Sequence, residues 1–192
     1  MLLNINHRDG SLWNSKNTIR DQKLEFRNDL KFMAGEKENE KMYDVSALGF
    51  GDNVVDKYEH IKTMYPGGNC VNFAVYAKMF GAKRSAYMGY FGNDAEAEHV
   101  MYALDDIGIE TVKCKQLEGE NGCARATLVD GDRVFLGSNE GGIRGKTPYV
   151  LDRFDLEYIR QFDFVHSGNY CFMEKELPKI HEAGVPISFD FS

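Results

Sequence analysis

Two asparagines open a predicted helix in the segment PGGNCVNFAVYAKMFGA, which begins at Pro66. Asn69 and Asn72 are three residues apart, so their amides lie on one face of the first helical turn. Amides both donate and accept hydrogen bonds, which suits the hydroxyl groups of a polyol. Gly67 and Gly68 precede them and allow a sharp turn with close approach of other atoms. The segment therefore predicts a polyol-binding helix N-terminus; the alternatives are a helix N-cap at Asn69 and a satisfied core amide at Asn72.

A second group of polar residues follows a predicted strand in the segment GFGDNVVD. Asp52, Asn53 and Asp56 lie just beyond the carboxyl end of that strand, where open α/β sheets bind their ligands. Gly49 and Gly51 have the spacing that starts a dinucleotide-binding fingerprint. The third glycine is absent and no helix pattern follows, which argues against a nicotinamide site. A turn role is the alternative for each aspartate.

Composition limits the class of protein. The 192 residues, 43% hydrophobic and 12% aromatic, are enough for one globular domain. The net charge of −7 argues against nucleic acid as the main partner, and no apolar run is long enough for a membrane span. No signal peptide is visible and the cysteines form no paired motif, so we expect a cytoplasmic protein with reduced thiols and no metal site made of protein ligands alone. The cysteines are Cys70, Cys114, Cys123 and Cys171.

Residues 1–41 differ from the rest of the chain. They are polar, show no sustained periodicity and end in a charge run, so we expect disorder or translated upstream sequence, with Met42 as the true start. A genuine extension is the alternative, and a short helix over 21–32 is a further prediction. We expect the folded part to be residues 42–192.

From Met42 onward, predicted strands and helices alternate, which indicates an α/β fold with a mainly parallel sheet. Two segments, 54–65 and 123–137, fit this sheet poorly and predict a small β flap over one end of it. The predicted helices are 68–80, 93–108 and 174–184, and the predicted strands are 43–51, short antiparallel pieces in 54–65, 83–92, a hairpin in 123–138, 162–170 and 185–192.

The segments GDNVVD, PGGNCVNFAVY and MGYFGND resemble the N-terminal signature of the ribokinase-like (PfkB) carbohydrate kinases. The later segments DRVFLGSNEGG, FVHSGNY and HEAGVPISFDFS make the chain most similar to the fructoselysine 6-kinase subgroup, with a fructokinase or ribokinase-type relative as the alternative. The resemblance covers Tyr43 to Ser192. It implies a ribokinase-like fold, in which a mainly parallel sheet is flanked by helices and the flap is a β lid that closes over a sugar.

The resemblance also implies which residues bind the sugar. Asp56 matches an aspartate that bonds sugar hydroxyls, and Gly67, Gly68, Asn69 and Asn72 match residues that line the same pocket. In many relatives the lid also forms a dimer contact, so a homodimer through the lid is a further expectation.

One more residue is expected to bind the substrate, and four others are possible contacts. Asp52 belongs to the narrower subgroup and is expected to be a further substrate contact. Glu140 and Asn169 are in predicted loops that are expected to border the pocket, with a solvated loop charge and a turn asparagine as the alternatives. Arg125 and Arg133, on the lid, are candidates for contact with a substrate carboxylate, with plain surface charges as the favoured alternative.

One feature of the family is missing from the sequence. The family's GAGD segment stabilises phosphoryl charge and supplies the aspartate that removes a proton from the attacking hydroxyl, and GAGD does not occur in these 192 residues. We therefore expect the sugar-binding half of a truncated kinase, with no catalytic residue in this chain and the C-terminal half missing. The ATP and Mg²⁺ used by the intact family are not expected to bind well to this chain alone. A non-catalytic sugar-binding or assembly protein is the alternative.

Overall fold

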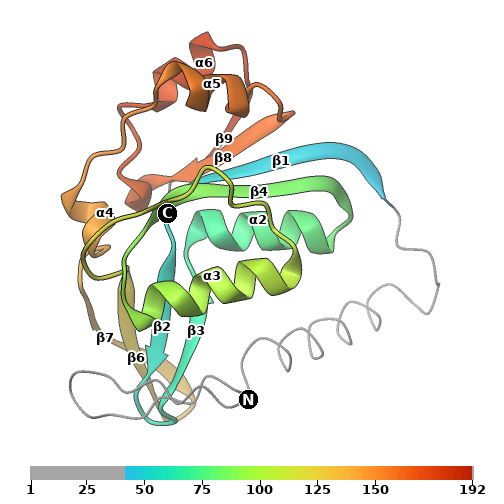
Figure 1. Cartoon of the computed structure of the whole chain (residues 1–192). Helices are drawn as coiled ribbons and strands as arrows, with labels where there is room; N and C mark the ends of the chain where they lie inside the picture. Colours follow the sequence, from blue (N-terminus) through green and yellow to red (C-terminus); the bar gives the residue numbers. More distant parts are fainter. Residues whose placement is uncertain (1–41, 192) are drawn as a thin grey trace.

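Two β-sheets organise residues 42–191, the part of the chain that the computed structural model describes (Figure 1). The larger sheet has five strands, all parallel, in the order β5-β4-β1-β8-β9. Its strands are β1 (Tyr43–Gly51), β4 (Ala82–Phe91), β5 (Lys115–Gln116), β8 (Phe164–Gly168) and β9 (Ile187–Asp190). The prediction of a mainly parallel sheet is confirmed. The predicted leader and its helix over 21–32 lie outside the described residues.

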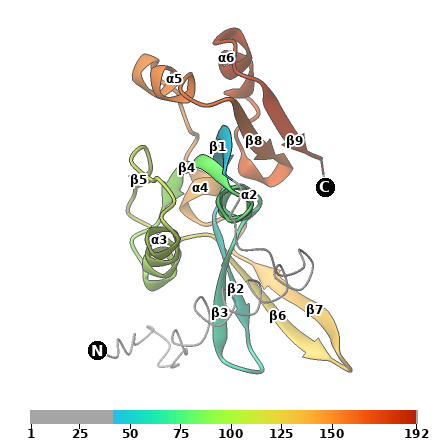
Figure 2. The ribbon, with the colours of Figure 1, turned by 90° about the vertical axis from the view of Figure 1, so that its right-hand side faces the viewer.

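The smaller sheet has four strands in the order β3-β2-β6-β7, and we call it the lid. Its strands are β2 (Val54–Tyr58), β3 (Thr63–Gly67), β6 (Cys123–Val129) and β7 (Asp132–Ser138). Strands β2 and β3 are antiparallel, as are β6 and β7, while β2 and β6 pair in parallel. Figure 2 shows the lid projecting away from the five-stranded sheet. The prediction of a β flap built from these two segments is confirmed.

Helices cover both faces of the larger sheet. Helices α2 and α3 lie on one side of it, and α5 and α6 lie on the other (Figures 1 and 2). Strand β1 pairs with β4 on one side and β8 on the other, so the strand order reverses at β1. A reversal of this kind opens a crevice at the carboxyl ends of the strands. The helices are α2 (Asn69–Met79), α3 (Ala95–Ile107), α4 (Ile143–Lys146), α5 (Arg153–Ile159), α6 (Leu177–Glu182) and the 3-10 turn η1 (Asn169–Cys171).

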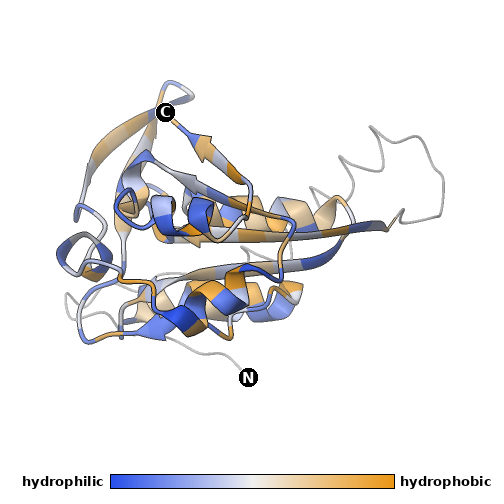
Figure 3. Cartoon of the chain, turned by 90° about the horizontal axis from the view of Figure 1, so that it is seen from above, coloured by the Kyte–Doolittle hydropathy of each residue, from blue (hydrophilic) through white to orange (hydrophobic). Residues whose placement is uncertain are grey.

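Helix α3 begins and ends where its sequence predicts. The Asp94 side chain accepts a hydrogen bond from the backbone N–H of Ala97 at 2.9 Å, and Gly108 ends the helix in the left-handed conformation at φ 77°. Glu96 and Glu98 in the first turn stabilise α3, because their negative charges interact favourably with the positive end of the helix dipole. In Figure 3, α3 carries both hydrophobic and hydrophilic segments, as expected for a helix with one buried face. Among the described residues, no helix is long and apolar enough to cross a membrane.

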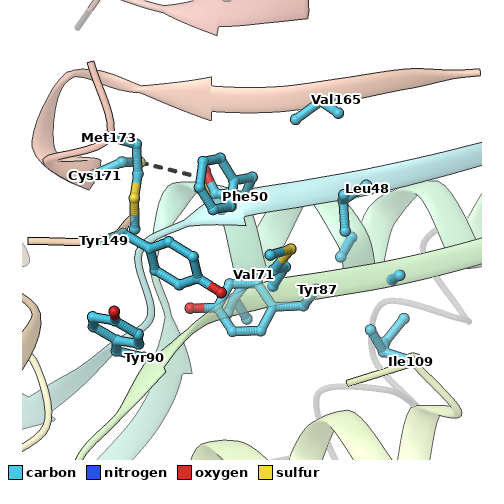
Figure 4. Close-up of a cluster of buried hydrophobic side chains, with 14 of the residues drawn as sticks. Leu48, Phe50, Val71, Tyr87, Tyr90, Ile109, Tyr149, Val165, Cys171 and Met173 are labelled. Carbon is cyan, nitrogen blue, oxygen red and sulfur yellow. Dashed lines mark hydrogen bonds between the residues drawn. The ribbon is translucent and has the colours of Figure 1, made fainter. Parts of the chain in front are cut away.

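The core lies between the larger sheet and its helices. Leu48 and Phe50 of β1 are fully buried, because a central parallel strand is covered on both faces. Figure 4 shows Phe50 close to Tyr149, and their ring centroids are 5.2 Å apart in an edge-to-face arrangement. This packing fixes the carboxyl end of β1, which is where the candidate aspartates begin.

Helix α3 also holds the base of the lid. Lys57 of β2 forms a mostly buried ion pair with Glu96, in the first turn of α3. One turn further along, Nε2 of buried His99 lies 3.1 Å from the carbonyl oxygen of Met64 in β3. Two strands of the lid are therefore attached to the body of the protein through a single helix.

We expect His99 to make folding stability fall as the pH drops below about 6.5. Burial lowers the pKa of His99 from its usual 6.5, so the folded protein holds the neutral imidazole, whose Nε2–H donates to Met64. The unfolded chain binds the proton first on acidification, so stability present above about pH 6.5 is lost as the pH falls toward the folded pKa. Thermal unfolding across pH 5–8 should show a weaker pH dependence in His99→Gln. An NMR titration midpoint for His99 at or above 6.5 would contradict this expectation.

Candidate functional site

The N-terminus of α2 lies at the carboxyl end of β1, and Asp52 joins the two. One Asp52 oxygen accepts a hydrogen bond from the backbone N–H of Asn69 and the other from that of Cys70, both at 2.8 Å. Asp52 is only 6% exposed, so water does little to stabilise its charge. The charge is stabilised instead by these two N–H groups of the first helical turn, which have no partner within the helix, and by the positive end of the helix dipole. Asp52 therefore caps α2 from outside the helix. Its predicted contact with a substrate stays a prediction.

Two glycines shape the turn into α2. Gly68 is the N-cap residue, with φ 105° and ψ 141°, so the alternative of an N-cap at Asn69 is wrong. A Cβ on Gly68 would lie 2.8 Å from the Cα of Asn53, which leaves room for glycine alone. A Cβ on Gly67 would lie 3.5 Å from Oδ2 of Asp56, so the Asp56 carboxylate faces this glycine. The predicted close approach of other atoms is confirmed at Gly68, whereas the contact at Gly67 is an ordinary van der Waals distance.

Asn69 connects α2 to the ends of two strands. Its amide oxygen lies 2.6 Å from Nε2 of His166 in β8, and its amide nitrogen donates to the carboxylate of Asp190 in β9. Because an amide oxygen only accepts, Nε2 of His166 carries the proton. Nδ1 of His166 lies 3.0 Å from the Ser188 hydroxyl, the ring stacks on Phe73, and burial lowers the pKa of His166. These contacts orient the Asn69 amide at the carboxyl edge of the sheet.

His166 and Asp190 are absent from the candidates drawn from the sequence. The only signal for them in the sequence is their position near the carboxyl ends of two predicted strands.

Asn72 differs from Asn69, because its side chain is exposed and forms no hydrogen bond with any residue of 42–191. The alternative of a satisfied core amide at Asn72 is therefore wrong, and the amide is open to a ligand.

The lid contributes a carboxylate and two paired arginines. Asp56 of β2 lies 3.2 Å from Nη2 of Arg133 in β7. Burial raises the pKa of Asp56, and the charge and hydrogen bond of Arg133 act in the opposite direction. Arg125 of β6 donates from Nε to Glu59 at 2.8 Å. Both lid arginines are thus already engaged by lid carboxylates, and their predicted contact with a substrate stays a prediction.

The two loop candidates are more peripheral. Glu140 is exposed between β7 and α4, in the left-handed conformation at φ 55°. Asn169 is also exposed, at the start of η1, and its amide nitrogen donates to the carbonyl of Phe191 at 2.7 Å. Among residues 42–191, no hydrogen bond or ion pair joins the Glu140 side chain to another candidate. The role of Glu140 and Asn169 at a pocket stays a prediction.

Two buried thiols, those of Cys70 and Cys171, lie next to the carboxylate of Asp52. The Sγ atoms of Cys70 and Cys171 are 3.3 Å apart, and the Cys171 thiol lies 3.3 Å from Oδ1 of Asp52. These three donor atoms are close enough to hold a metal ion. However, Asp52 already accepts two helix N–H groups, the positive end of α2 disfavours a cation, and burial raises the pKa of the Cys70 thiol. The donor set is better explained by thiol hydrogen bonding than by a metal.

The fold and this site together define an α/β protein of the ribokinase-like class. Arabidopsis thaliana ribokinase, solved in complex with ribose and ATP, superposes with a TM-score of 0.64 at 19% identity, covering 78% of this chain and 54% of that one. Fructokinase from Xylella fastidiosa superposes with a TM-score of 0.58 at 18% identity, covering 77% and 52%. At such identities the likeness shows the fold, and the ribokinase-like prediction is confirmed.

Residues 36–185 match the family model for pfkB family carbohydrate kinases, and the chain belongs to this family. Fructosamine kinase FrlD of Bacillus subtilis (strain 168) is 41% identical over 146 residues, which are 76% of this chain and 51% of that protein. Fructoselysine 6-kinase of Escherichia coli (strain K12) is 30% identical over 142 residues, covering 74% and 53%. The chain thus spans about half the length of these curated relatives.

Proposed function

We propose that this chain holds the acceptor sugar of an ATP-dependent kinase, and that the sugar is a ketosamine such as fructoselysine. The observation that carries this proposal is the meeting of the lid carboxylate Asp56 with the glycine-led N-terminus of α2. A carboxylate accepts hydrogen bonds from hydroxyls, and amides both donate and accept, so together they suit a polyol. The names of the two relatives support the ketosamine class.

Each residue of the site has a distinct role in this proposal. Asp56 accepts hydrogen bonds from sugar hydroxyls, and the exposed amide of Asn72 supplies a donor and an acceptor. Gly67 lets the sugar approach the backbone, and Gly68 allows the close turn against Asn53 that places the start of α2 beside it. Asn69 contributes an oriented amide, and Asp52 keeps the first turn of α2 in place.

Phosphoryl transfer needs more than a positioned sugar. Orientation of the acceptor is one part of catalysis, and stabilisation of charge on the transferring group is the other. ATP and Mg²⁺ are present in a solved complex of an Escherichia coli putative ribokinase II, and the magnesium complex of ATP would be the phosphoryl donor of the proposed reaction. Since this sequence lacks the GAGD segment, we expect sugar binding by this chain without sugar-dependent release of ADP.

Calorimetric titration of the chain with fructoselysine, fructose and ribose tests the proposal. We expect saturable binding of all or some of these sugars, with fructoselysine bound most tightly. A chain that is folded by circular dichroism and binds none of the three would contradict the proposal. Tighter binding of fructose than of fructoselysine would move the substrate class to a fructokinase.

We also propose that the lid joins two copies of the chain. Strands β6 and β7 carry a run of exposed apolar side chains, and β7 is an edge strand of the lid. Exposed β edges favour pairing with another chain. We expect Phe135→Asp to shift the sedimentation of a dimer toward a monomer. Phe154→Asp on α5 is the matched control, because Phe135 and Phe154 are both 61% exposed. Identical sedimentation of the two variants would contradict a lid interface. The run comprises Leu128, Val129, Val134, Phe135 and Leu136.

A further inference from the structure

Arg144, in the short helix α4 that follows the lid, is a buried cation. Only 4% of the residue is exposed, and no ion pair found within residues 42–191 includes it. A buried charge is costly unless an opposite charge or several hydrogen bonds compensate it. Other arginines of the chain have such partners: Arg84 with Glu110, Arg125 with Glu59, Arg133 with Asp56 and Arg160 with Glu157.

The contacts of Arg144 leave most of its hydrogen-bonding capacity unused. Nη1 donates to the carbonyl oxygen of Tyr170, and the guanidinium carbon lies 5.0 Å from the centre of the Phe172 ring. Nε is buried without a hydrogen-bond partner. A guanidinium has five N–H donors in a planar fork, so one carbonyl contact and one aromatic face do not satisfy it. An anion is the kind of partner that would compensate such a buried charge.

The backbone around Arg144 leaves room for the guanidinium close to the candidate site. Gly141 has φ 84°, and a Cβ on it would lie 2.5 Å from Nη2 of Arg144. Tyr170 belongs to η1, and the next residue, Cys171, contacts the carboxylate of Asp52. Figure 1 shows α4 at the end of the larger sheet from which the lid projects. Arg144 therefore lies between the loop that leaves the lid and the turn that borders Asp52.

We propose that Arg144 is the anion subsite of the candidate sugar site and receives the carboxylate of a glycated amino acid. This inference rests on the proposed function. A ketosamine formed from an amino acid carries a carboxylate, which a simple ketose lacks. A guanidinium can bind a carboxylate through two parallel N–H···O bonds. The lid arginines expected to do this, Arg125 and Arg133, are each paired with a lid acid.

A purely structural role makes a different prediction. In that account, Arg144 joins the loop after the lid to η1 through Tyr170 and Phe172, and its loss weakens binding of every ligand by the same factor. The subsite account predicts that its loss affects only ligands with a carboxylate. The ratio of two affinities therefore separates the accounts, while a change in thermal stability does not.

The experiment is a calorimetric titration of the full chain with fructosylglycine and with fructosylglycinamide, which differ in the carboxylate alone. We expect the wild-type chain to bind fructosylglycine about 10 to 100 times more tightly, as charge-assisted hydrogen bonds predict. Arg144→Met should reduce this ratio to near one, and Arg144→Lys should retain part of it. Arg153→Met, an exposed arginine of α5 outside the site, should keep the full ratio.

Each other outcome overturns a defined part of the account. Equal wild-type affinity for the two ligands overturns the subsite and leaves the proposed function standing. Absence of binding for both ligands overturns the proposed function and the subsite with it. An unchanged ratio in Arg144→Met also overturns the subsite. If Arg144→Met does not fold, Arg144→Lys and the wild-type comparison still decide the question.

Discussion

Replacing Asp52 by alanine is expected to lower the free energy of unfolding by about 3–5 kcal/mol. Asp52 is the acceptor for the backbone N–H groups of Asn69 and Cys70, and the thiol of Cys171 lies 3.3 Å from it. Alanine would leave these donors buried without a partner. Urea unfolding monitored by circular dichroism measures the change, and Asp52→Asn should cost less because its amide oxygen replaces one acceptor.

A second helix cap provides the control. Asp152 accepts from the backbone N–H groups of Phe154 and Asp155 at the start of α5, but it is exposed, so water can replace it. Asp152→Ala is expected to cost about 1 kcal/mol, the usual value for an exposed cap. Equal losses in Asp52→Ala and Asp152→Ala would contradict the importance assigned to burial at Asp52.

Gly68→Ala is expected to cost about 3–4 kcal/mol of stability and to abolish sugar binding. The backbone of Gly68, at φ 105° and ψ 141°, is strained for any other residue by about 1–3 kcal/mol. The added methyl group would also lie 2.8 Å from the Cα of Asn53, so the backbone at the turn into α2 must shift. Thermal unfolding and the calorimetric titration measure the two losses.

Gly108→Ala separates backbone strain from steric overlap. Gly108 is also left-handed, at φ 77°, but a Cβ there meets nothing within 4 Å. We expect this variant to lose about 1 kcal/mol and to bind sugar as the wild type does. A loss in Gly68→Ala no larger than in Gly108→Ala would show that the turn into α2 tolerates a side chain.

The sequence predicted helices and strands well where a capping residue or a turn residue next to the element marks its end. Asp94 and Gly108 mark the ends of α3. The hairpin of the lid turns at Asp130 and Gly131, one residue before the predicted Gly131–Asp132 turn. Helix α5 was not predicted, although Asp152 and Asp155 form a capping box at its start. The helix is only seven residues long, so its apolar periodicity is too brief to stand out.

The candidate site was predicted only in part, because its contacts join distant segments. Asn69 meets His166 and Asp190, which lie 97 and 121 residues further along the chain. No local pattern around Asn69 indicates these partners, and the same holds for the Asp52–Cys171 contact. The sequence indicated the residue types that suit a sugar, whereas the order of the strands determines which of them meet.

The most direct test of the proposed sugar site is the affinity of Asp56→Ala for fructoselysine, measured by calorimetry at an unchanged unfolding midpoint. We predict a loss of about 10- to 100-fold, since hydrogen bonds to a charged group contribute about 1.5–3 kcal/mol. Glu59→Ala is the matched control, because Glu59 also pairs with a lid arginine but lies outside the proposed site, and it should bind as the wild type does. Wild-type affinity in Asp56→Ala would contradict the proposed site.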